Sequence, residues 1–544
     1  MISEIDSKLF RDAIESGYAN LENRKQTVNN LNVFPVPDGD TGTNMALTIQ
    51  YAVKEMDRAP SSNISETAST CSNGALMGAR GNSGVILSQL FRGISKSCKG
   101  KTVLNIADVA EALQAASDMA YKAVMKPTEG TILTVAREMA EYAVAHVGEY
   151  TDCTEFFEKI ILEGYVSLKN TPNLLQVLKD AGVVDAGGQG LLFIFEGFLQ
   201  AMRGDPIVMQ ESVEVVESTE FGMDINSEIT YAYCTEFLIT THENQDYEKM
   251  LIDKLIKLGD SLVVVQDENI VKIHVHTNEP WVAMKIAAGI GDLTKIKIEN
   301  MRQQHSEIFQ KEEQQNHKTS PYSEEETDYV LVSVSAGSGL SNILKDLGVT
   351  YVIEGGQTMN PSTQDFLDVI ENTNGKHYIL FPNNKNIILA AEQAKKISEK
   401  DVQVLPTKTI PEAISALMSF NSAVSMDENI GEMSASIETV KTGQITFAVR
   451  DSSMNHIKIK KGDIIGILDG EIAVSKKDIV SAAESLIEKM TDSDTELLTL
   501  YYGEEISENE AKELQESIQK KHPKIDVELF EGNQPLYYYI VSAE

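Results

Sequence analysis

The chain has 544 residues, of which 42% are hydrophobic and 24% charged, a composition typical of a folded protein with several domains. Its formal net charge of −35 argues against nucleic-acid binding and against broad adhesion to anionic membranes, because both depend on basic residues. We find no apolar run long enough for a membrane span and no signal-peptide pattern in the first residues, so we expect a cytoplasmic location.

Residues 1–204 have the hydrophobic spacing of helices. Near the start, apolar residues recur with the helical period at Leu9, Phe10, Ala13, Ile14 and Tyr18. Further long apolar segments follow at 84–94, 106–125, 131–146, 155–168 and 190–203. The short connections between them contain Gly, Pro or Asn, so the pattern predicts an all-α bundle.

Two carboxylates, Asp38 and Asp40, lie one residue apart just before a helical pattern that begins near Met45. Pro35 and Pro37 stiffen the approach to them, because proline fixes its own φ and keeps the preceding residue extended. A helix N-terminus attracts anions, and carboxylates and a phosphate can share it when a cation lies between them. Magnesium suits that arrangement. The alternative is an Asp-Gly-Asp turn that only caps the helix.

A second segment, Met77–Gly84, contains three glycines before the apolar segment 84–94. Its backbone N–H groups could cradle a phosphate, with Ser83 adding a hydroxyl and Arg80 a positive charge. It lacks the Gly-Lys-Ser/Thr of a Walker A loop. A tight turn between two helices, with Arg80 in solvent, is the alternative.

Two more junctions place polar residues and glycines at predicted helix starts. Asp185 and Gly187 lie in Val184–Gly190, and Thr131 lies at the end of Lys126–Thr131. Each is a candidate for the same site, and each has a helix cap as its alternative.

An acidic linker is predicted at 205–227, and after it the hydrophobic period changes to two, which indicates a small α+β domain at 228–308. His274 and His276 lie two apart in a predicted strand, so both point to one face. Cys234 lies in another predicted strand, and one Cys with two His suits zinc. No fourth ligand is evident. Exposed histidines and a buried cysteine are the alternative.

A second linker is predicted at 309–327, where Gln, Glu, Ser and Lys are frequent. From 328 to 544, strand and helix patterns alternate before a tail rich in strands. That alternation predicts an α/β domain with a parallel or mixed sheet.

Taken together, these motifs resemble the ATP-binding subunit of bacterial fatty acid kinases over nearly the whole chain, and residues 1–204 resemble the L subunit of dihydroxyacetone kinases. The resemblance depends on ten segments: Leu31–Met45, Leu76–Gly93, Lys126–Val135, Val183–Leu192, Tyr233–Glu236, Val271–Thr277, Gly355–Thr363, Phe381–Asn386, Pro406–Lys408 and Ala448–Asp451.

The resemblance implies an eight-helix bundle that binds ATP and two magnesium ions. Asp38 and Asp40 match two of the three metal-binding aspartates of dihydroxyacetone kinases, and Asn32 falls near the position of the third. An amide binds magnesium less strongly than a carboxylate does. Residues in the matching segments would contact the nucleotide: Thr41, Asn44, Gly78, Arg80, Gly81, Asn82, Ser83, Gly84, Thr131, Asp185 and Gly187. The chemistry would be phosphoryl transfer by positioning and charge neutralisation.

The resemblance also implies a metal in the middle domain and a DegV-like C-terminal domain that docks a separate fatty-acid-binding protein. Gly355–Thr363, Asn383–Asn386 and Arg450 are candidates for ligand or partner contacts there, with turns and caps as the alternative. The expected product is an acyl phosphate for phospholipid synthesis, and a homodimer is expected. Two other functions stay open, a kinase for a small molecule such as dihydroxyacetone and a non-catalytic nucleotide-sensing scaffold.

Overall fold

A computed structural model describes residues 2–32, 39–124, 126–209, 233–242, 245, 247–267, 270–300, 326–356, 359–454 and 457–544. The chain forms two compact units. One consists of Met1–Ser212 together with Ser323–Glu544, and the other is Val213–Tyr322.

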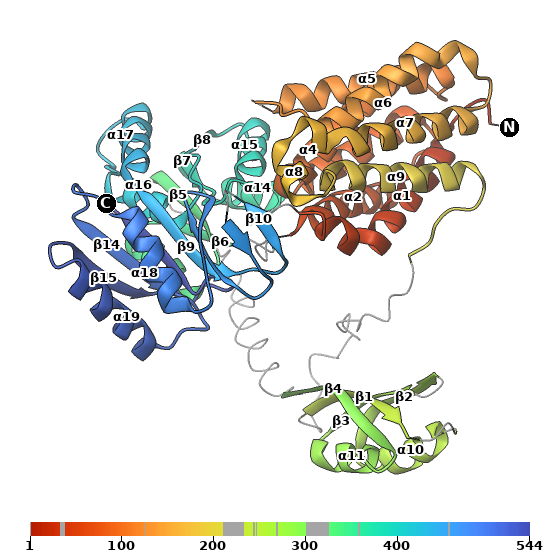
Figure 1. Cartoon of the computed structure of the whole chain (residues 1–544). Helices are drawn as coiled ribbons and strands as arrows, with labels where there is room; N and C mark the ends of the chain where they lie inside the picture. The colour runs from red at the N-terminus through yellow and green to blue at the C-terminus, as the bar shows by residue number, and fades with distance from the viewer. Residues whose placement is uncertain are drawn as a thin grey trace. The chain divides into compact units, whose positions relative to one another are not determined.

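The N-terminal part of the first unit is helical, as the sequence predicts (Figure 1). Its long helices are α1 (Ser7–Asn29), α2 (Thr41–Arg58), α3 (Ile64–Met77), α4 (Gly81–Cys98), α5 (Ile106–Ala123), α6 (Ile132–His146), α7 (Cys153–Leu174) and α9 (Ala186–Met202). A short helix, α8 (Gln176–Ala181), and a 3₁₀ turn, η1 (Val147–Glu149), complete the described elements of this part. Side-chain caps determine where several of these helices begin. The Asp6 side chain accepts a hydrogen bond from Leu9 N, and Asn105 and Asp108 form a capping box.

Helix α9 is the centre of the bundle. Its sequence is apolar on nearly every side, and Leu192 and Ile194 are fully enclosed. A helix with this composition is stable only when other helices surround it, and α9 contacts α1, α2, α6 and α7. Two polar bonds fix α1 against it, from Ser16 Oγ to Gly197 O at 2.7 Å and from Asn20 Nδ2 to Phe193 O at 2.6 Å.

The C-terminal part of the first unit begins with a parallel four-stranded sheet, as predicted. The strand order is β6-β5-β7-β8, with strands β5 (Thr327–Ser335), β6 (Tyr351–Glu354), β7 (Gly375–Phe381) and β8 (Asp401–Val404). The helices between and after these strands are α13 (Ser338–Asp346), α14 (Thr363–Asn372), α15 (Ile388–Ile397), α16 (Ile410–Met418) and α17 (Met426–Thr439). Buried Val330, Val332, Ile379 and Leu380 show why a parallel sheet, covered on both faces, needs continuous apolar runs.

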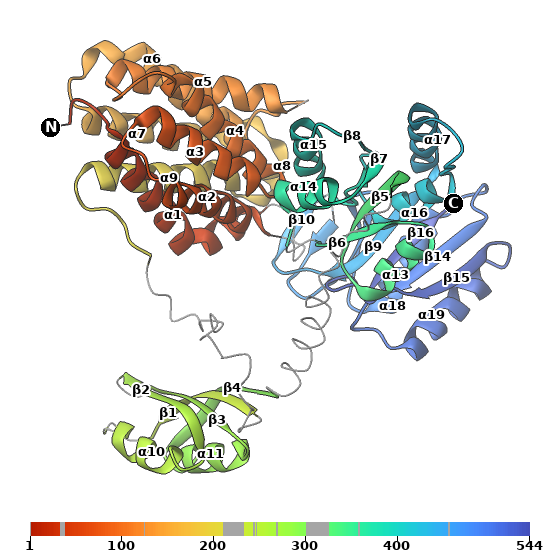
Figure 2. The ribbon, with the colours of Figure 1, turned by 180° about the vertical axis from the view of Figure 1, so that it is seen from behind.

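A mixed six-stranded sheet follows, in the order β13-β12-β9-β16-β14-β15. Its strands are β9 (Lys441–Phe447), β12 (Ile464–Leu468), β13 (Glu471–Lys476), β14 (Leu497–Tyr502), β15 (Asp526–Glu531) and β16 (Tyr539–Ala543). Helices α18 (Ile479–Met490) and α19 (Glu508–Lys521) share one apolar core with this sheet (Figure 2). A separate ribbon joins β10 (Ser452–Met454) to β11 (Ile457–Ile459).

The second unit is a small α+β domain, again as predicted. An antiparallel sheet in the order β2-β3-β1-β4 contains β1 (Tyr233–Thr241), β2 (Gly259–Asp267), β3 (Ile270–Thr277) and β4 (Gly291–Asn300). Helices α10 (Glu248–Leu255) and α11 (Pro280–Ala287) cover one face of it (Figures 1 and 2). Among the described residues of the whole chain, we find no helix with the length and apolar character that crossing a membrane requires.

Candidate functional site

Four helix N-termini meet at one end of the bundle. Those of α2 and α4 are neighbours, because Arg80 N donates a hydrogen bond of 3.4 Å to Thr48 Oγ1. Those of α9 and α6 are joined by Asp185, which accepts hydrogen bonds from backbone N–H groups in both helices. Gly190 of α9 lies against the sulfur of Met45 in α2. The positive ends of four helix dipoles therefore point to one region, and helix N-termini are suited to anions such as phosphate.

Asp40 precedes α2, but its carboxylate does not cap that helix. Asn29, from the end of α1, takes the capping role. Its Oδ1 accepts hydrogen bonds from Gly42 N at 2.7 Å and Thr43 N at 3.2 Å. The capping alternative for Asp40 is therefore wrong. A buried carboxylate that is not needed by its own helix suits a bound cation.

Of the other two predicted metal ligands, the structure describes Asn32 but not Asp38. Asn32 follows α1, and Gly39, the neighbour of Asp40, packs close to it, since a Cβ on Gly39 would lie 3.6 Å from Asn32 Cβ. Asn44 is buried in the first turn of α2, and Thr41 is half-buried at its start. The structure therefore brings Asn32, Asp40, Thr41 and Asn44 to the same corner of the bundle.

The Gly78–Gly84 segment forms a tight turn between α3 and α4, as the structural alternative held. The other part of that alternative is wrong, because Arg80 is not in solvent and its side chain bonds to Asn360 O. Helix α4 begins at Gly81 without a side-chain cap, and phosphate binding by its first N–H groups stays a prediction. Gly81 has a φ of +57°, and a Cβ there would lie 2.5 Å from Asn44 Nδ2. The turn thus brings the uncapped start of α4, with half-buried Asn82 and Ser83, beside Asn44.

Residues of the C-terminal domain complete this corner. Asn360 Nδ2 donates a hydrogen bond to Asp40 Oδ2. Arg80 Nη1 donates one of 2.8 Å to the backbone oxygen of Asn360 and lies 3.7 Å from Asp365 Oδ2. The sequence singled out the segment containing Asn360 only as a ligand or partner contact. Its position beside Asp40, 320 residues away, carries no local signal.

Thr131 is a helix cap, as its structural alternative held. It precedes α6, and its Oγ1 accepts a hydrogen bond from Leu133 N at 3.4 Å and donates one of 2.8 Å to Thr128 O. A nucleotide contact by this hydroxyl stays a prediction.

Asp185 is the N-cap of α9 and accepts a hydrogen bond of 2.7 Å from Gly188 N. Burial of its carboxylate raises the pKa of Asp185 to about 6, and backbone N–H groups of Gly188, Ile132 and Gly187 oppose that rise. Gly187 is buried in the same first turn. These two residues therefore hold α6 and α9 together, which positions two of the four helix starts.

The raised pKa of Asp185 gives a testable pH dependence. The pKa of this carboxyl group is about 6 in the folded protein, whereas its ordinary value is 3.8. Such a group contributes stability that is fully present below about pH 4 and is lost as the pH rises through about 6. In the wild type, the unfolding free energy should fall by about 3 kcal/mol between these limits, and we expect Asp185→Asn to remove that fall. Urea unfolding followed by far-ultraviolet circular dichroism measures it.

Asp152→Asn is the matched control, because Asp152 caps α7 in the same domain. Partial burial works to raise the pKa of Asp152, but the backbone N–H groups of Thr154 and Ile2 outweigh it and lower that pKa. Removal of this carboxylate should therefore change the pH slope in the opposite direction. Equal slopes for wild type and Asp185→Asn would contradict the assignment.

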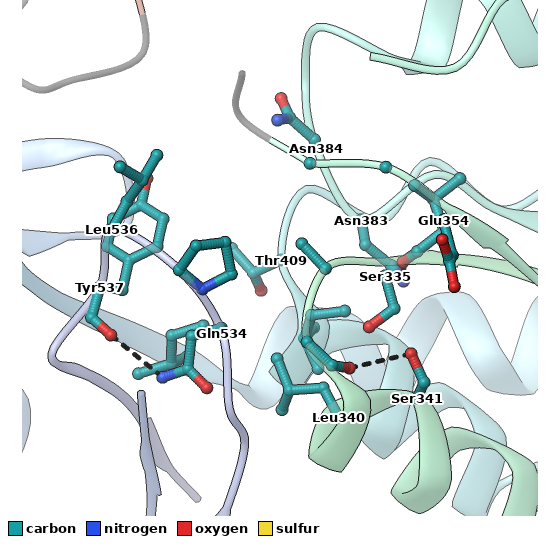
Figure 3. Close-up of a pocket in the computed structure, with 18 of the residues that line it drawn as sticks. Ser335, Leu340, Ser341, Glu354, Asn383, Asn384, Thr409, Gln534, Leu536 and Tyr537 are labelled. Carbon is teal, nitrogen blue, oxygen red and sulfur yellow. Dashed lines mark hydrogen bonds between the residues drawn. The ribbon is translucent and has the colours of Figure 1, made fainter. Parts of the chain in front are cut away.

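A cavity of about 570 Å³ lies within the C-terminal domain. Figure 3 shows Ser335, Glu354 and Asn383 on one side and Gln534, Leu536 and Tyr537 on the other. It adjoins the carboxyl ends of parallel strands, where α/β sheets commonly bind ligands. Asn383 has a φ of +58°, which asparagine adopts more readily than most residues, and Leu536 has a φ of +69°, which is strained for leucine. No pattern in the sequence indicates a role for Gln534 or Tyr537.

Strand register places the predicted zinc ligands on neighbouring strands of the middle domain. Cys234 of β1 is opposite His276 of β3, and Glu236 is opposite His274. The side chains of Cys234, Glu236 and His274 lie outside the described residues. Within the described part of the chain, no group of three His, Cys, Asp or Glu side chains is arranged to hold a metal ion, so the zinc prediction is not supported.

Comparison with known proteins adds three family matches. Residues 35–200 match the model described as "DAK2 domain". Residues 230–308 match the model of the FakA-like middle domain of fatty acid kinases, and residues 330–544 match the model of the FakA-like C-terminal domain.

Whole-chain relatives and solved structures were also found. Two uncharacterized proteins of Staphylococcus aureus, from strains bovine RF122 / ET3-1 and USA300, are each 44% identical over 100% of both chains. The DegV family protein Cg2579 from Corynebacterium glutamicum is 14% identical, with a TM-score of 0.32 over 40% of this chain and 96% of that one. The C. freundii dihydroxyacetone kinase in complex with AMP-PNP and Mg²⁺ is 15% identical, with a TM-score of 0.28 over 40% of this chain and 48% of that one.

The family models cover the helical, middle and C-terminal parts of the chain in turn, and the relatives match it from end to end. The chain therefore belongs to the FakA-like family of fatty acid kinase subunits.

Proposed function

We propose that this chain is the ATP-binding subunit of a fatty acid kinase. It transfers the γ-phosphoryl group of ATP to the carboxylate of a fatty acid, giving an acyl phosphate for phospholipid synthesis and ADP. The observation that carries this proposal is Asp40, a buried carboxylate released from capping by Asn29 where four helix N-termini meet. The family supports a kinase, and the site supports binding of a nucleotide through its phosphates.

Asp40, with Asp38 and Asn32, would hold the magnesium ions of this site. When bound, magnesium neutralises charge on the phosphate oxygens. The N–H groups at the start of α4 and the hydroxyl of Ser83 would hold those oxygens, with Thr41 and Asn44 beside them. Arg80 would balance the remaining negative charge. The residues act by orienting the nucleotide and excluding water, which is how most phosphoryl transfer is catalysed.

The transfer balances without a covalent protein intermediate. An oxygen of the fatty acid carboxylate forms a bond to the γ-phosphorus. The bond from that phosphorus to the β–γ bridging oxygen breaks, and the electron pair leaves with ADP. The acceptor is already an anion, so no general base is needed to remove a proton from it.

The acceptor would arrive bound to a second protein. A long acyl chain in water is unfavourable in proportion to its apolar area, so a carrier that encloses the chain and presents the carboxylate is needed. The matched family is named for one subunit of an enzyme, which supports a partner of this kind. We propose a DegV-like fatty-acid-binding protein, docked by the C-terminal domain of a cytoplasmic homodimer.

The test combines the purified full chain, ATP, magnesium and a fatty-acid-loaded carrier, and detects acyl phosphate by trapping it with hydroxylamine. We expect product that depends on ATP, magnesium and the loaded carrier. A parallel reaction with dihydroxyacetone tests a small-molecule kinase, and ATP consumption there alone would replace the proposed acceptor. Nucleotide binding without transfer to either acceptor would indicate a scaffold and contradict the proposal.

A further inference from the structure

Three segments of the C-terminal domain, which we call the docking segments, meet the nucleotide end of the helical bundle. They are Gly355–Thr363, of which residues 357 and 358 lie outside the described part, Asn383–Asn386, and Arg450. Asn360 contacts Asp40, and Asn386 Oδ1 accepts a hydrogen bond of 3.3 Å from Asn82. Arg450 donates hydrogen bonds to the backbone oxygens of Asn30, at 3.2 Å, and Asn32. Each segment therefore reaches a different loop of the candidate site.

Backbone contacts fix the first docking segment in place. Arg80 and Ser362 form an isolated antiparallel bridge, and Thr363 N donates a hydrogen bond of 3.2 Å to Ala79 O. Backbone pairing of this kind sets a register that side-chain contacts alone do not. The segment thus lies along the turn that precedes α4, next to the N–H groups proposed to hold phosphate.

Both charged groups at the centre of the proposed site are occupied by the docking segments. Asp40, which is 8% exposed, accepts a hydrogen bond from the Asn360 amide, and Asn360 is 1% exposed. Arg80 is bonded to the backbone oxygen of Asn360 and lies near Asp365. The carboxylate proposed for the metal and the guanidinium proposed for phosphate therefore both have partners on the other domain.

The contact is incompletely satisfied. Asn360 Oδ1, Thr363 Oγ1 and Arg80 Nε are buried and have no hydrogen-bond partner among the described residues. Unpaired buried polar atoms weaken an interface, because each gave up water without gaining a replacement. A closed arrangement held in this way is suited to opening when a stronger ligand arrives.

We infer that the C-terminal domain gates the nucleotide site, and that Asn360 competes with magnesium for Asp40. This inference rests on the proposed function. Magnesium keeps several of its waters when it binds a protein carboxylate. Asp40 is buried with Asn360 against it, so a hydrated magnesium ion reaches the carboxylate only when Asn360 moves away. Binding of magnesium with nucleotide then favours release of the docking segment, and by the same linkage docking of that segment weakens nucleotide binding.

The test uses the full chain and a fluorescent ATP analogue, titrated at a series of magnesium concentrations. Asn360→Ala removes the amide but keeps the backbone bond to Arg80. We expect it to bind the magnesium–nucleotide complex about 5-fold more tightly than wild type, or more. Arg450→Ala breaks a separate docking contact and should shift binding in the same direction.

Asn372→Ala is the matched control, because Asn372 lies in the same domain and bonds to Asp368 O, at 2.7 Å, within α14. It should bind like wild type. Unchanged or weaker nucleotide binding in both Asn360→Ala and Arg450→Ala would contradict the proposed gate. If circular dichroism shows that Asn360→Ala is misfolded, the result for Arg450→Ala alone decides. Asp40→Ala separates the two proposals, because retained magnesium-dependent binding there would refute the proposed site itself.

Discussion

Asp40→Ala is expected to lower phosphoryl transfer by about 1,000-fold or more while the helical domain stays folded. The loss follows from removing a metal-binding carboxylate at the point where phosphate charge must be neutralised. The fold survives because the side chain makes no capping bond, and Asn29 satisfies the first N–H groups of α2. Acyl phosphate formation and urea unfolding, measured on the same preparation, check both parts.

Asp6→Ala provides the contrast. Asp6 is also the residue before a helix, but its carboxylate does cap α1, with 2.8 Å to Leu9 N. We expect this variant to lose about 1 kcal/mol of unfolding free energy and to keep its turnover. If Asp40→Ala retained full turnover, Asp40 would not be a metal ligand. If it lost as much stability as Asp6→Ala does, the hydrogen bond from Asn360, which this variant also removes, would be the contact that stabilises the fold.

Local patterns in the sequence were sufficient to predict the fold class of each part of the chain, though not the strand order of its sheets. Hydrophobic period distinguishes the bundle at Ser7–Met202 from the sheets that follow, and alternation of strands and helices after Thr327 predicts the parallel sheet. Motifs before helix starts likewise led to Asp40, Gly81 and Asp185. These features depend on residues that are close together in the sequence, so they can be predicted from local sequence patterns.

The remaining features of the site depend on contacts between distant residues. Asn29 caps α2 from the preceding helix, and nothing in its own neighbourhood distinguishes it from other asparagines. Asn360 reaches Asp40 across 320 residues. Gln534 and Asn383 come to one cavity from different sheets. No spacing rule links such pairs, so only the packed structure reveals that the docking segments meet the predicted nucleotide site.

Gly42→Ala is the second substitution with a large expected effect. A Cβ at this position would lie 2.3 Å from the backbone oxygen of Lys25 and 2.9 Å from Asn29 Oδ1. The clash is with backbone in α1, which cannot rotate away as a side chain could, so α1 and α2 must separate. We expect a loss of about 1–3 kcal/mol in unfolding free energy.

The same movement should reduce turnover by about 100-fold, because it displaces Asp40, and a shift of about 1 Å in a group that positions the substrate can cost that much in rate. It also disrupts the Asn29 cap, since Asn29 Oδ1 binds Gly42 N. Gly148→Ala is the control, as no atom lies within 4 Å of the added Cβ and the residue belongs to the same domain. Urea unfolding and single-turnover kinetics should separate the two variants. Equal stability and turnover would mean that α2 accepts the extra methyl without moving, and Asp40 would then not depend on the close approach of α1.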